Sequence, residues 1–240
     1  MRLDVALTPR DVEPGRLRDR AVVVFDVLRA TTTMTAALAA GVAGIRVFES
    51  LDAAAAAANG FAEPRVLCGE RQCLRPPGFD LGNSPGAFDA RQHAGRTVFM
   101  STTNGTRAIV AARSAKLLLA GALVNASAVA NHLIPAGLDV TLLCAGTDGE
   151  PAMEDLLGAG AVIDALAVMR DVELQNDNAR VALRMLRCCR GELRPMLADA
   201  AGGRNVIAAG LEADIDFAAR LDALDVVGRV LGNPLRVVRG

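Results

Sequence analysis

Two clusters of hydroxyl side chains are spaced so that they could bind a tetrahedral oxyanion. The first consists of Thr31, Thr32 and Thr33, with Arg29 just before it, and the second occupies residues 101–106. Each follows an apolar segment and opens a predicted helix, whose first N–H groups attract anions. N-capping needs one hydroxyl and would by itself account for either cluster. Because each cluster contains more hydroxyl groups than capping needs, we expect both to bind a phosphate or sulfonate, with Arg29 adding charge-assisted hydrogen bonds. The candidates in the second cluster are Ser101, Thr102, Thr103, Asn104, Gly105 and Thr106.

A loop rich in proline and glycine, residues 69–85, carries further polar side chains. Its prolines restrict the backbone, and rigid loops commonly position functional residues. Arg71, Asn83 and Ser84 are therefore candidates for binding the substrate. Asp80 and Asn83 could instead bond their own backbone in Asx turns, and the sequence leaves both interpretations open.

Carboxylates are predicted to lie beside the anion site. Asp26 ends an apolar segment, Glu70 begins the loop, Asp148 lies in a polar turn, and Glu154 opens the next predicted helix. Carboxylates next to a phosphate repel it by on the order of several kcal/mol at low dielectric, unless a cation intervenes. A hard divalent ion, most simply Mg²⁺, prefers oxygen ligands. We therefore expect Mg²⁺ on some of these four residues, although Glu154 could merely stabilise the helix dipole by about 0.3–1 kcal/mol.

Several common site designs are absent from the sequence. There is no G-x-x-x-x-G-K-[ST] phosphate loop, and the residues after Asp26 lack the second aspartate of the D-x-D pattern. None of Cys68, Cys73 and Cys144 precedes an arginine by six residues, as a cysteine phosphatase requires. Cys68 and Cys73 could form half of a zinc site, but distant residues would have to complete it, so free thiols are the favoured interpretation.

Strand, polar turn and helix alternate three times along the chain. The predicted strands are residues 21–25, 97–100 and 140–144, and the helices that follow them are residues 34–40, 108–112 and 153–170. Unbroken apolar strands suit a sheet covered on both faces. We therefore predict an α/β fold with α/β/α layers around a mostly parallel or mixed sheet. The carboxyl ends of its strands are expected to bring the polar turns together.

Shorter elements complete the prediction. They are strands at residues 44–48, 65–68, 116–119 and 235–238 and helices at residues 53–58, 178–189 and 192–201. Gly202 and Gly203 are expected to break the chain after the last of these helices. No low-complexity linker occurs, so residues 1–240 are predicted to form one unit, which could contain two similar, intimately packed lobes divided near residues 120–135.

Composition excludes several classes of function. The 240 residues contain 26 basic and 27 acidic side chains, a net charge of −1, so no basic face is expected to bind nucleic acid. No apolar run approaches the roughly 18 residues of a membrane span. The N-terminus lacks the pattern of a signal peptide, and five cysteines suit reduced thiols, so a cytoplasmic protein is expected. Apolar helix faces could pack either in the core or against a second copy of the chain, so the sequence leaves both a monomer and a homodimer open.

The candidate residues also lie in motifs that resemble those of the 2-phosphosulfolactate phosphatase family. These motifs are DVLRATTT at 26–33, GER at 69–71, GFDLGNSP at 78–85, STTNGT at 101–106, CAG at 144–146 and ED at 154–155. The resemblance implies a magnesium-dependent phosphatase that releases phosphate from 2-phospho-3-sulfolactate, a step toward coenzyme M. The chain departs from the family at residues 72–77, where such proteins often have glycines. This departure is expected to reshape the mouth of the pocket, which bears on the substrate rather than on phosphomonoester hydrolysis.

Asp26, Arg29 and Glu70 are the expected catalytic residues. Two routes remain open: water activated by the metal attacks the phosphorus, or Asp26 attacks first and forms an aspartyl phosphate. A rival interpretation is a non-catalytic sensor that binds a small phosphorylated or sulfonated metabolite with the same loops. Such a sensor needs little metal, because capture alone requires no activated nucleophile.

Overall fold

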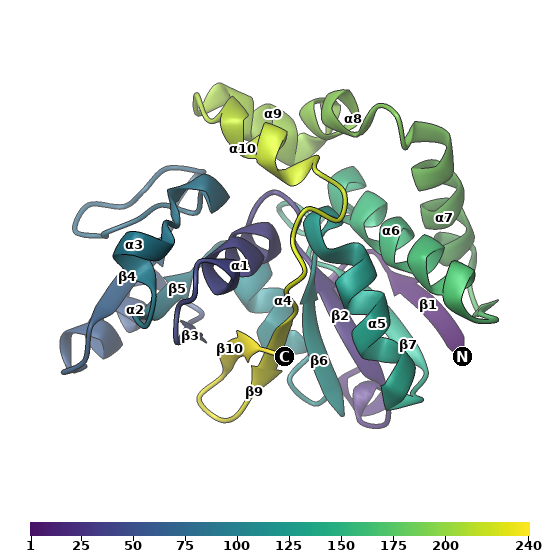
Figure 1. Cartoon of the computed structure of the whole chain (residues 1–240), viewed down its shortest axis with the longest axis horizontal. Helices are drawn as coiled ribbons and strands as arrows, with labels where there is room; N and C mark the ends of the chain where they lie inside the picture. Colours follow the sequence, from purple (N-terminus) through teal and green to yellow (C-terminus); the bar gives the residue numbers. More distant parts are fainter.

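The computed structural model describes the backbone of residues 1–240 and the side chains of all of them except Pro14. Its strands form a single sheet of ten (Figure 1). The strands are β1 (Arg2–Ala6), β2 (Ala21–Phe25), β3 (Gly44–Val47), β4 (Arg65–Gly69), β5 (Thr97–Ser101), β6 (Leu117–Gly121), β7 (Val140–Cys144), β8 (Glu173–Leu174), β9 (Gly228–Leu231) and β10 (Arg236–Arg239).

Helices flank this sheet. They are α1 (Ala30–Ala39), α2 (Leu51–Asn59), α3 (Ala90–His93), α4 (Gly105–Ala111), α5 (Ala126–Ala136), α6 (Met153–Met169), α7 (Asp177–Cys189), α8 (Leu193–Asp199), α9 (Ala201–Ala208) and α10 (Glu212–Ala218). Short 3₁₀ turns lie at Pro9–Asp11, Pro14–Leu17, Pro85–Ala87 and Leu123–Asn125.

The sheet consists of two parallel blocks joined by an antiparallel hairpin. Its strand order is β4-β5-β3-β10-β9-β6-β2-β7-β1-β8. Strands β4, β5 and β3 are mutually parallel, as are β6, β2, β7, β1 and β8, whereas β10 and β9 pair antiparallel with each other and with their outer neighbours. Three successive reversals therefore make the two blocks run in opposite directions. The predicted α/β fold with a mixed, mostly parallel sheet is confirmed.

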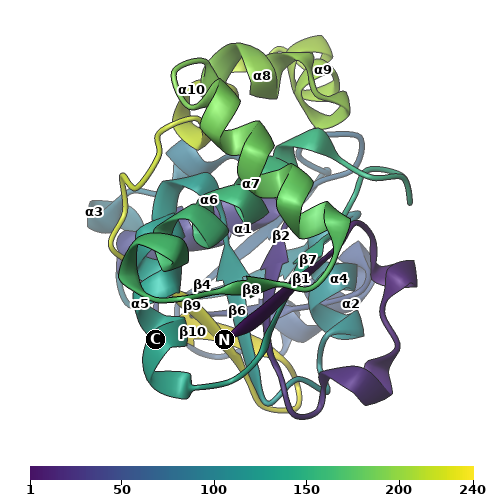
Figure 2. The same cartoon turned by 90° about the vertical axis from the view of Figure 1, so that its right-hand side faces the viewer.

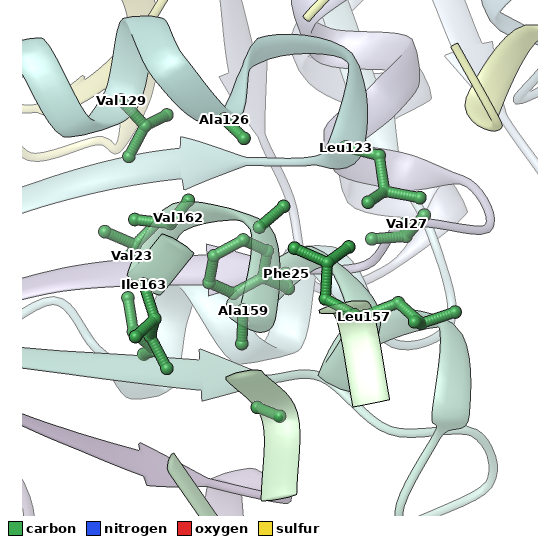
Figure 3. Close-up of a cluster of buried hydrophobic side chains, with 14 of the residues drawn as sticks. Val23, Phe25, Val27, Leu123, Ala126, Val129, Leu157, Ala159, Val162 and Ile163 are labelled. Atoms are coloured by element: carbon green, nitrogen blue, oxygen red, sulfur yellow. The ribbon is translucent and has the colours of Figure 1, made fainter. Parts of the chain in front are cut away.

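Both faces of the sheet are covered, which explains the unbroken apolar strands. In β2, Val23 and Phe25 face the core under α5, α6 and α7, while Val22 and Val24 face the core under α1 and α4. Figure 3 shows Phe25 packed among side chains of α5 and α6. Every residue of β2 is buried. On the outer block, α2 packs against β4 and β5.

The last helices, α8, α9 and α10, gather beyond one end of the sheet (Figures 1 and 2). Helix α9 contradicts the prediction that Gly202 and Gly203 break the chain, because it runs through both glycines. A Cβ on Gly202 would lie 2.1 Å from Oε1 of Glu154, and one on Gly203 would lie 1.8 Å from the carbonyl oxygen of Leu197. These glycines serve close packing rather than helix termination.

The start of one helix also differs from the prediction. Helix α1 begins at Ala30, so Thr31, Thr32 and Thr33 lie within its first turn instead of before Met34. Strand β1 and helix α5 were not predicted at all.

Among the residues that the structure describes, no helix is long and apolar enough to cross a membrane. The lobe division near residues 120–135 stays a prediction.

Candidate active site

Most of the polar turns line a single cavity of about 550 Å³. Figure 1 shows the elements that surround it. Its walls come from five parts of the chain: the end of β2, the loop after β4, the turn after β5, the turn after β7, and helix α9. The lining residues are Asp26, Leu28, Arg29, Glu70, Gln72, Cys73, Leu74, Asn83, Thr102, Thr103, Asn104, Thr147, Asp148, Gly202, Asn205, Ala208 and Ala209.

Asp26 lies at the carboxyl end of β2 and is 7% exposed. Its Oδ1 accepts the N–H of Ala30 at 3.1 Å, and the N–H of Gly105 also donates to its carboxylate. Burial raises the pKa of Asp26 to about 6, and the nearby Glu70 carboxylate acts in the same direction, against the two N–H donors. A Cβ on Gly105 would lie 2.6 Å from Oδ2 of Asp26, so only glycine fits at the start of α4.

Glu70 fastens two walls of the cavity together. Its Oε1 accepts the backbone N–H of Thr103 at 2.8 Å and the hydroxyl of Thr103 at 2.7 Å. Its Oε2 accepts the N–H of Cys73 at 3.0 Å. Gln72 and Cys73 both have positive φ, at 51° and 66°, so the chain turns sharply beneath this carboxylate. Glu70 thus holds the turn after β5 against its own loop while still facing the cavity.

Glu154 and Asp155 open α6 behind Asp26, and both are buried. Asp155 accepts the N–H of Val27 at 2.8 Å and that of Gly146 at 3.0 Å, which ties β2 to the turn after β7. Glu154 receives an N–H bond from Gly202, but its Oε2 has no partner among the described residues. Burial raises the pKa of Glu154, with the charge of Asp26 adding to it, and raises that of Asp155 well above its usual value.

The threonine hydroxyls of α1 face inward. Thr31 Oγ1 donates to the Asp26 carbonyl at 2.9 Å, Thr32 Oγ1 to the Val27 carbonyl at 2.8 Å, and Thr33 Oγ1 to the Asn83 carbonyl at 3.0 Å. All three side chains are fully buried and lie outside the cavity lining. Thr31 and Thr32 therefore fix the backbone around Asp26, and Thr33 fixes the loop after β4. The structure does not bring these hydroxyls to the cavity as the sequence suggested.

The second hydroxyl cluster divides between the cavity and the interior. Thr102, Thr103 and Asn104 line the cavity, whereas Thr106 closes a turn by donating its hydroxyl to the Thr102 carbonyl at 2.7 Å. Ser101 is buried within β5. Gly105 contributes its N–H to Asp26 rather than a side chain.

The remaining predicted residues are also divided. Asn83 lines the cavity, is 3% exposed, and has an Oδ1 without a partner among the described residues. Asp148 lines it from an exposed turn with φ of 54°. Arg71 is exposed and outside the lining. Ser84 donates its hydroxyl to Asp214 at 2.8 Å and does not line the cavity.

Arg29 joins three segments of the chain. Its Nη1 donates to Oδ2 of Asp214 at 2.5 Å and to Oγ of Ser84 at 3.3 Å, and its Nη2 donates to the carbonyl of Cys73 at 2.6 Å. The side chains of Arg29 and Asp214 are 2% and 7% exposed, so this is a buried ion pair. Arg29 nevertheless forms part of the cavity wall.

Sequence reasoning missed the contribution of α9 and α10. Gly202 and Asn205 line the cavity from α9, and Asp214 reaches Arg29 from α10. The sequence around Asp214 carries only a weak signal, because residues 210–225 resemble the family less closely than the motifs given above. Two adjacent glycines are typical of a helix end, so the sequence does not reveal that Gly202 packs against Glu154 and Gly203 against Leu197.

The carboxylates fit a divalent cation only in part. No group of three or more His, Cys, Asp or Glu side chains suited to a metal occurs among the described residues. Glu70 and Asp155 already use both oxygens to accept N–H or O–H groups. Glu154 keeps an unpartnered Oε2 close enough to Asp26 for their charges to interact. Mg²⁺ commonly binds through one or two carboxylates plus water and phosphate. The candidate ligands are therefore Asp26, which lines the cavity although it accepts the N–H groups of Ala30 and Gly105, and Glu154, which lies behind the cavity wall with one free oxygen.

Comparison with known proteins identifies a family over nearly the whole chain. Residues 6–233 match the family model described as 2-phosphosulpholactate phosphatase. A probable 2-phosphosulfolactate phosphatase from Carboxydothermus hydrogenoformans is 40% identical over 227 residues, which is 95% of this chain and 92% of the relative. Proteins with the same name from Deinococcus radiodurans and Thermus thermophilus are 41% and 42% identical, over 92% and 88% of this chain and 90% and 89% of their own lengths.

Proposed function

The chain belongs to the 2-phosphosulfolactate phosphatase family, and we propose that it is a magnesium-dependent enzyme that hydrolyses a small phosphorylated acid, 2-phospho-3-sulfolactate being the first candidate. The observation that carries the proposal is one cavity in which Asp26 and Arg29, from the turn after β2, meet Glu70, from the loop after β4. A buried carboxyl with a pKa of about 6 beside a guanidinium is suited to phosphoryl transfer rather than to simple scaffolding.

Donors for the phosphoryl oxygens come from nitrogen atoms rather than from the hydroxyls of α1. Arg29 offers guanidinium N–H groups, and the carboxamides of Asn83, Asn104 and Asn205 also line the cavity. Amide and guanidinium donors fixed by the fold stabilise charge on a transferring phosphoryl group without having to reorganise. We assign these four side chains to binding the phosphate in the ground state and the transition state.

Charge explains why a cation belongs in this site. Asp26, Glu70 and Asp148 line the cavity against one guanidinium, Arg29, and Glu154 lies buried behind them. A phosphate would meet net repulsion there. Asp26 and Glu154 would hold Mg²⁺, which when bound neutralises phosphoryl charge and lowers the pKa of a coordinated water.

Glu70 is assigned the role of accepting the proton of the attacking water. Its carboxylate is held by Thr103 and Cys73, so its position is fixed, and it faces the same cavity as Asp26. Water then adds to phosphorus and gives its proton to a Glu70 oxygen, while the P–O bond to the substrate breaks and the ester oxygen leaves as the alcohol after taking a proton from solvent water. In the other route, Asp26 attacks first. An acid-quenched enzyme that carries phosphate removable by hydroxylamine would show that route instead.

The test is a phosphate-release assay over small phosphorylated acids, with EDTA and with added Mg²⁺. We expect release that EDTA stops and Mg²⁺ restores, and a loss of at least about 100-fold in Asp26→Asn. Asp171→Asn, at an exposed aspartate outside the cavity, is the matched control. Tight binding of phosphorylated acids without turnover, and without a need for metal, would instead identify a sensor.

A further inference from the structure

The buried ion pair between Arg29 and Asp214 connects the catalytic turn to the last helices. Asp214 is on α10, and 185 residues of chain separate it from Arg29. Ser84 donates to the same Oδ2 atom of Asp214 and accepts a bond from Arg29, so the three side chains form a closed triangle. The Cys73 carbonyl accepts a fourth bond. The turn after β2, the loop after β4 and α10 are thereby fixed relative to one another.

The donors of Arg29 can be counted. A guanidinium has five N–H groups, two on each Nη and one on Nε. Nη1 donates to Asp214 and Ser84, and Nη2 donates once to Cys73. Among the side chains that the structure describes, the Nε–H and the second N–H of Nη2 have no protein acceptor, and Arg29 forms part of the cavity wall. Because the fork is planar and rigid, bonds at one edge determine where the other edge points.

We propose that Asp214 is a positioning residue that acts through Arg29: by holding Nη1, it directs the two free N–H groups of the guanidinium toward the phosphoryl oxygens. This inference rests on the proposed function, since it assumes that the cavity binds phosphate. It also gives α10 a role in the reaction although α10 contributes no residue to the cavity lining.

A purely stabilising role explains the arrangement less well. Desolvation offsets much of the attraction in a buried ion pair, so apolar side chains of similar size would hold α10 at least as firmly. Helix α10 already buries Ile215 and Ala218 in the main core. An apolar contact cannot fix the plane of a guanidinium. The hydrogen bonds of Asp214 and Ser84 to Arg29 fix that plane.

The test is a double-mutant cycle on the full chain with Mg²⁺, read out as kcat/KM and as the Kd for inorganic phosphate. Asp214→Asn should lower kcat/KM about 100-fold and weaken phosphate binding about tenfold, whereas Asp214→Glu should stay within about tenfold of wild type. Asp216→Asn is the matched control, since Asp216 lies on the same helix in an exposed pair with Arg194. It should leave both quantities unchanged.

The cycle is completed in an Arg29→Met background. If Asp214 acts through Arg29, Asp214→Asn should then cost no more than about twofold, and the double variant removes both buried charges, which favours folding. Arg29→Lys replaces Arg29→Met if the latter does not fold. A 100-fold loss from Asp214→Asn in both backgrounds would overturn the proposal, as would Asp214→Asn with wild-type kcat/KM.

Failure of the proposed function gives a different result. If wild type releases no phosphate from any substrate, the Kd for inorganic phosphate still tests Asp214. Weakening by Asp214→Asn that disappears in the Arg29 variant supports the positioning role by itself. Equal phosphate affinity in wild type and Asp214→Asn refutes it.

Discussion

Replacing Asp26 by asparagine should abolish activity and at the same time stabilise the protein at neutral pH. The carboxyl is 7% exposed, and its pKa is about 6 in the folded protein against an ordinary value of 3.8. The folded state therefore binds this proton more tightly than the unfolded chain does. Stability must fall as the pH rises from about 4 through about 6, because ionisation is easier in the unfolded chain.

The size of this effect follows from the pKa difference. One pKa unit corresponds to about 1.4 kcal/mol, so ionised Asp26 lowers the free energy of unfolding by about 3 kcal/mol above pH 7 and by almost nothing below pH 4. Asparagine does not titrate, so the variant lacks this loss. Removing the Asp26 charge also eases the ionisation of Glu154 and Asp155, which it opposes in the wild type. The difference in free energy of unfolding between Asp26→Asn and wild type should therefore grow with pH.

The measurement is urea unfolding of wild type and Asp26→Asn in EDTA at pH values from 4.5 to 8. The free energy of unfolding of the variant should rise relative to wild type by about 2 kcal/mol across this range, because about 1 of the 3 kcal/mol is already lost at pH 4.5. Asp171→Asn serves as the control for the loss of one carboxylate, because Asp171 is exposed and lies outside the cavity. A variant that is less stable than wild type at pH 8, or a difference that stays constant with pH, would refute the reasoning.

Three further substitutions test other parts of the site and fold. Gly202→Ala places a Cβ 2.1 Å from Oε1 of Glu154 and should weaken Mg²⁺ binding about 10–100-fold, as measured by calorimetry. Gly191→Ala is the control, because its Cβ meets open space and should leave the Mg²⁺ affinity unchanged. Equal Mg²⁺ affinities of Gly202→Ala and wild type would contradict the assignment of Glu154 as a ligand. Glu70→Gln should lower kcat about 100–10,000-fold, and a smaller loss would remove Glu70 as proton acceptor. Gly160→Ala puts a Cβ 2.3 Å from the Ala182 carbonyl oxygen, where α6 packs on α7, and should lower the free energy of unfolding by about 1–3 kcal/mol. The loss should appear as a lower Tm. An unchanged Tm would show that the two helices can move apart without loss of stability.

The sequence predicted the elements whose own pattern is strong. The strands at β2, β5 and β7 are continuous apolar runs, and the structure has them within a residue of the predicted bounds. Strand β1 was missed because it lies in a short alternating stretch at the N-terminus, where pairing with β7 decides its conformation. Helix α5 contains Pro135 and begins with small residues, and it is stabilised by packing on α6 rather than by its propensity.

Prediction of the site depended on which groups the fold leaves free. Asp26 and Glu70 were expected beside a cavity, and they are there. The hydroxyls of Thr31 and Thr33 have the right chemistry for binding phosphate, but α1 starts one turn earlier than expected and directs them to backbone carbonyls. A residue list alone cannot distinguish these cases, because the same hydroxyl group caps a turn or binds a ligand depending on a shift of four residues in the start of the helix.

The convergence of the polar turns has a different origin from the one expected. A single parallel sheet would bring the ends of β2, β4 and β5 to one edge, but the antiparallel hairpin of β9 and β10 makes the block with β4 and β5 run opposite to the block with β2. Five steps separate β5 from β2 in the sheet order. At the usual twist of about 20–25° per strand, about 100–125° would accumulate over that distance, which is enough to turn the carboxyl ends of the reversed block toward those of the other. If the site depends on this twist, substitutions in β9 or β10 that flatten the sheet should lower kcat/KM by separating Glu70 from Asp26 without touching either residue.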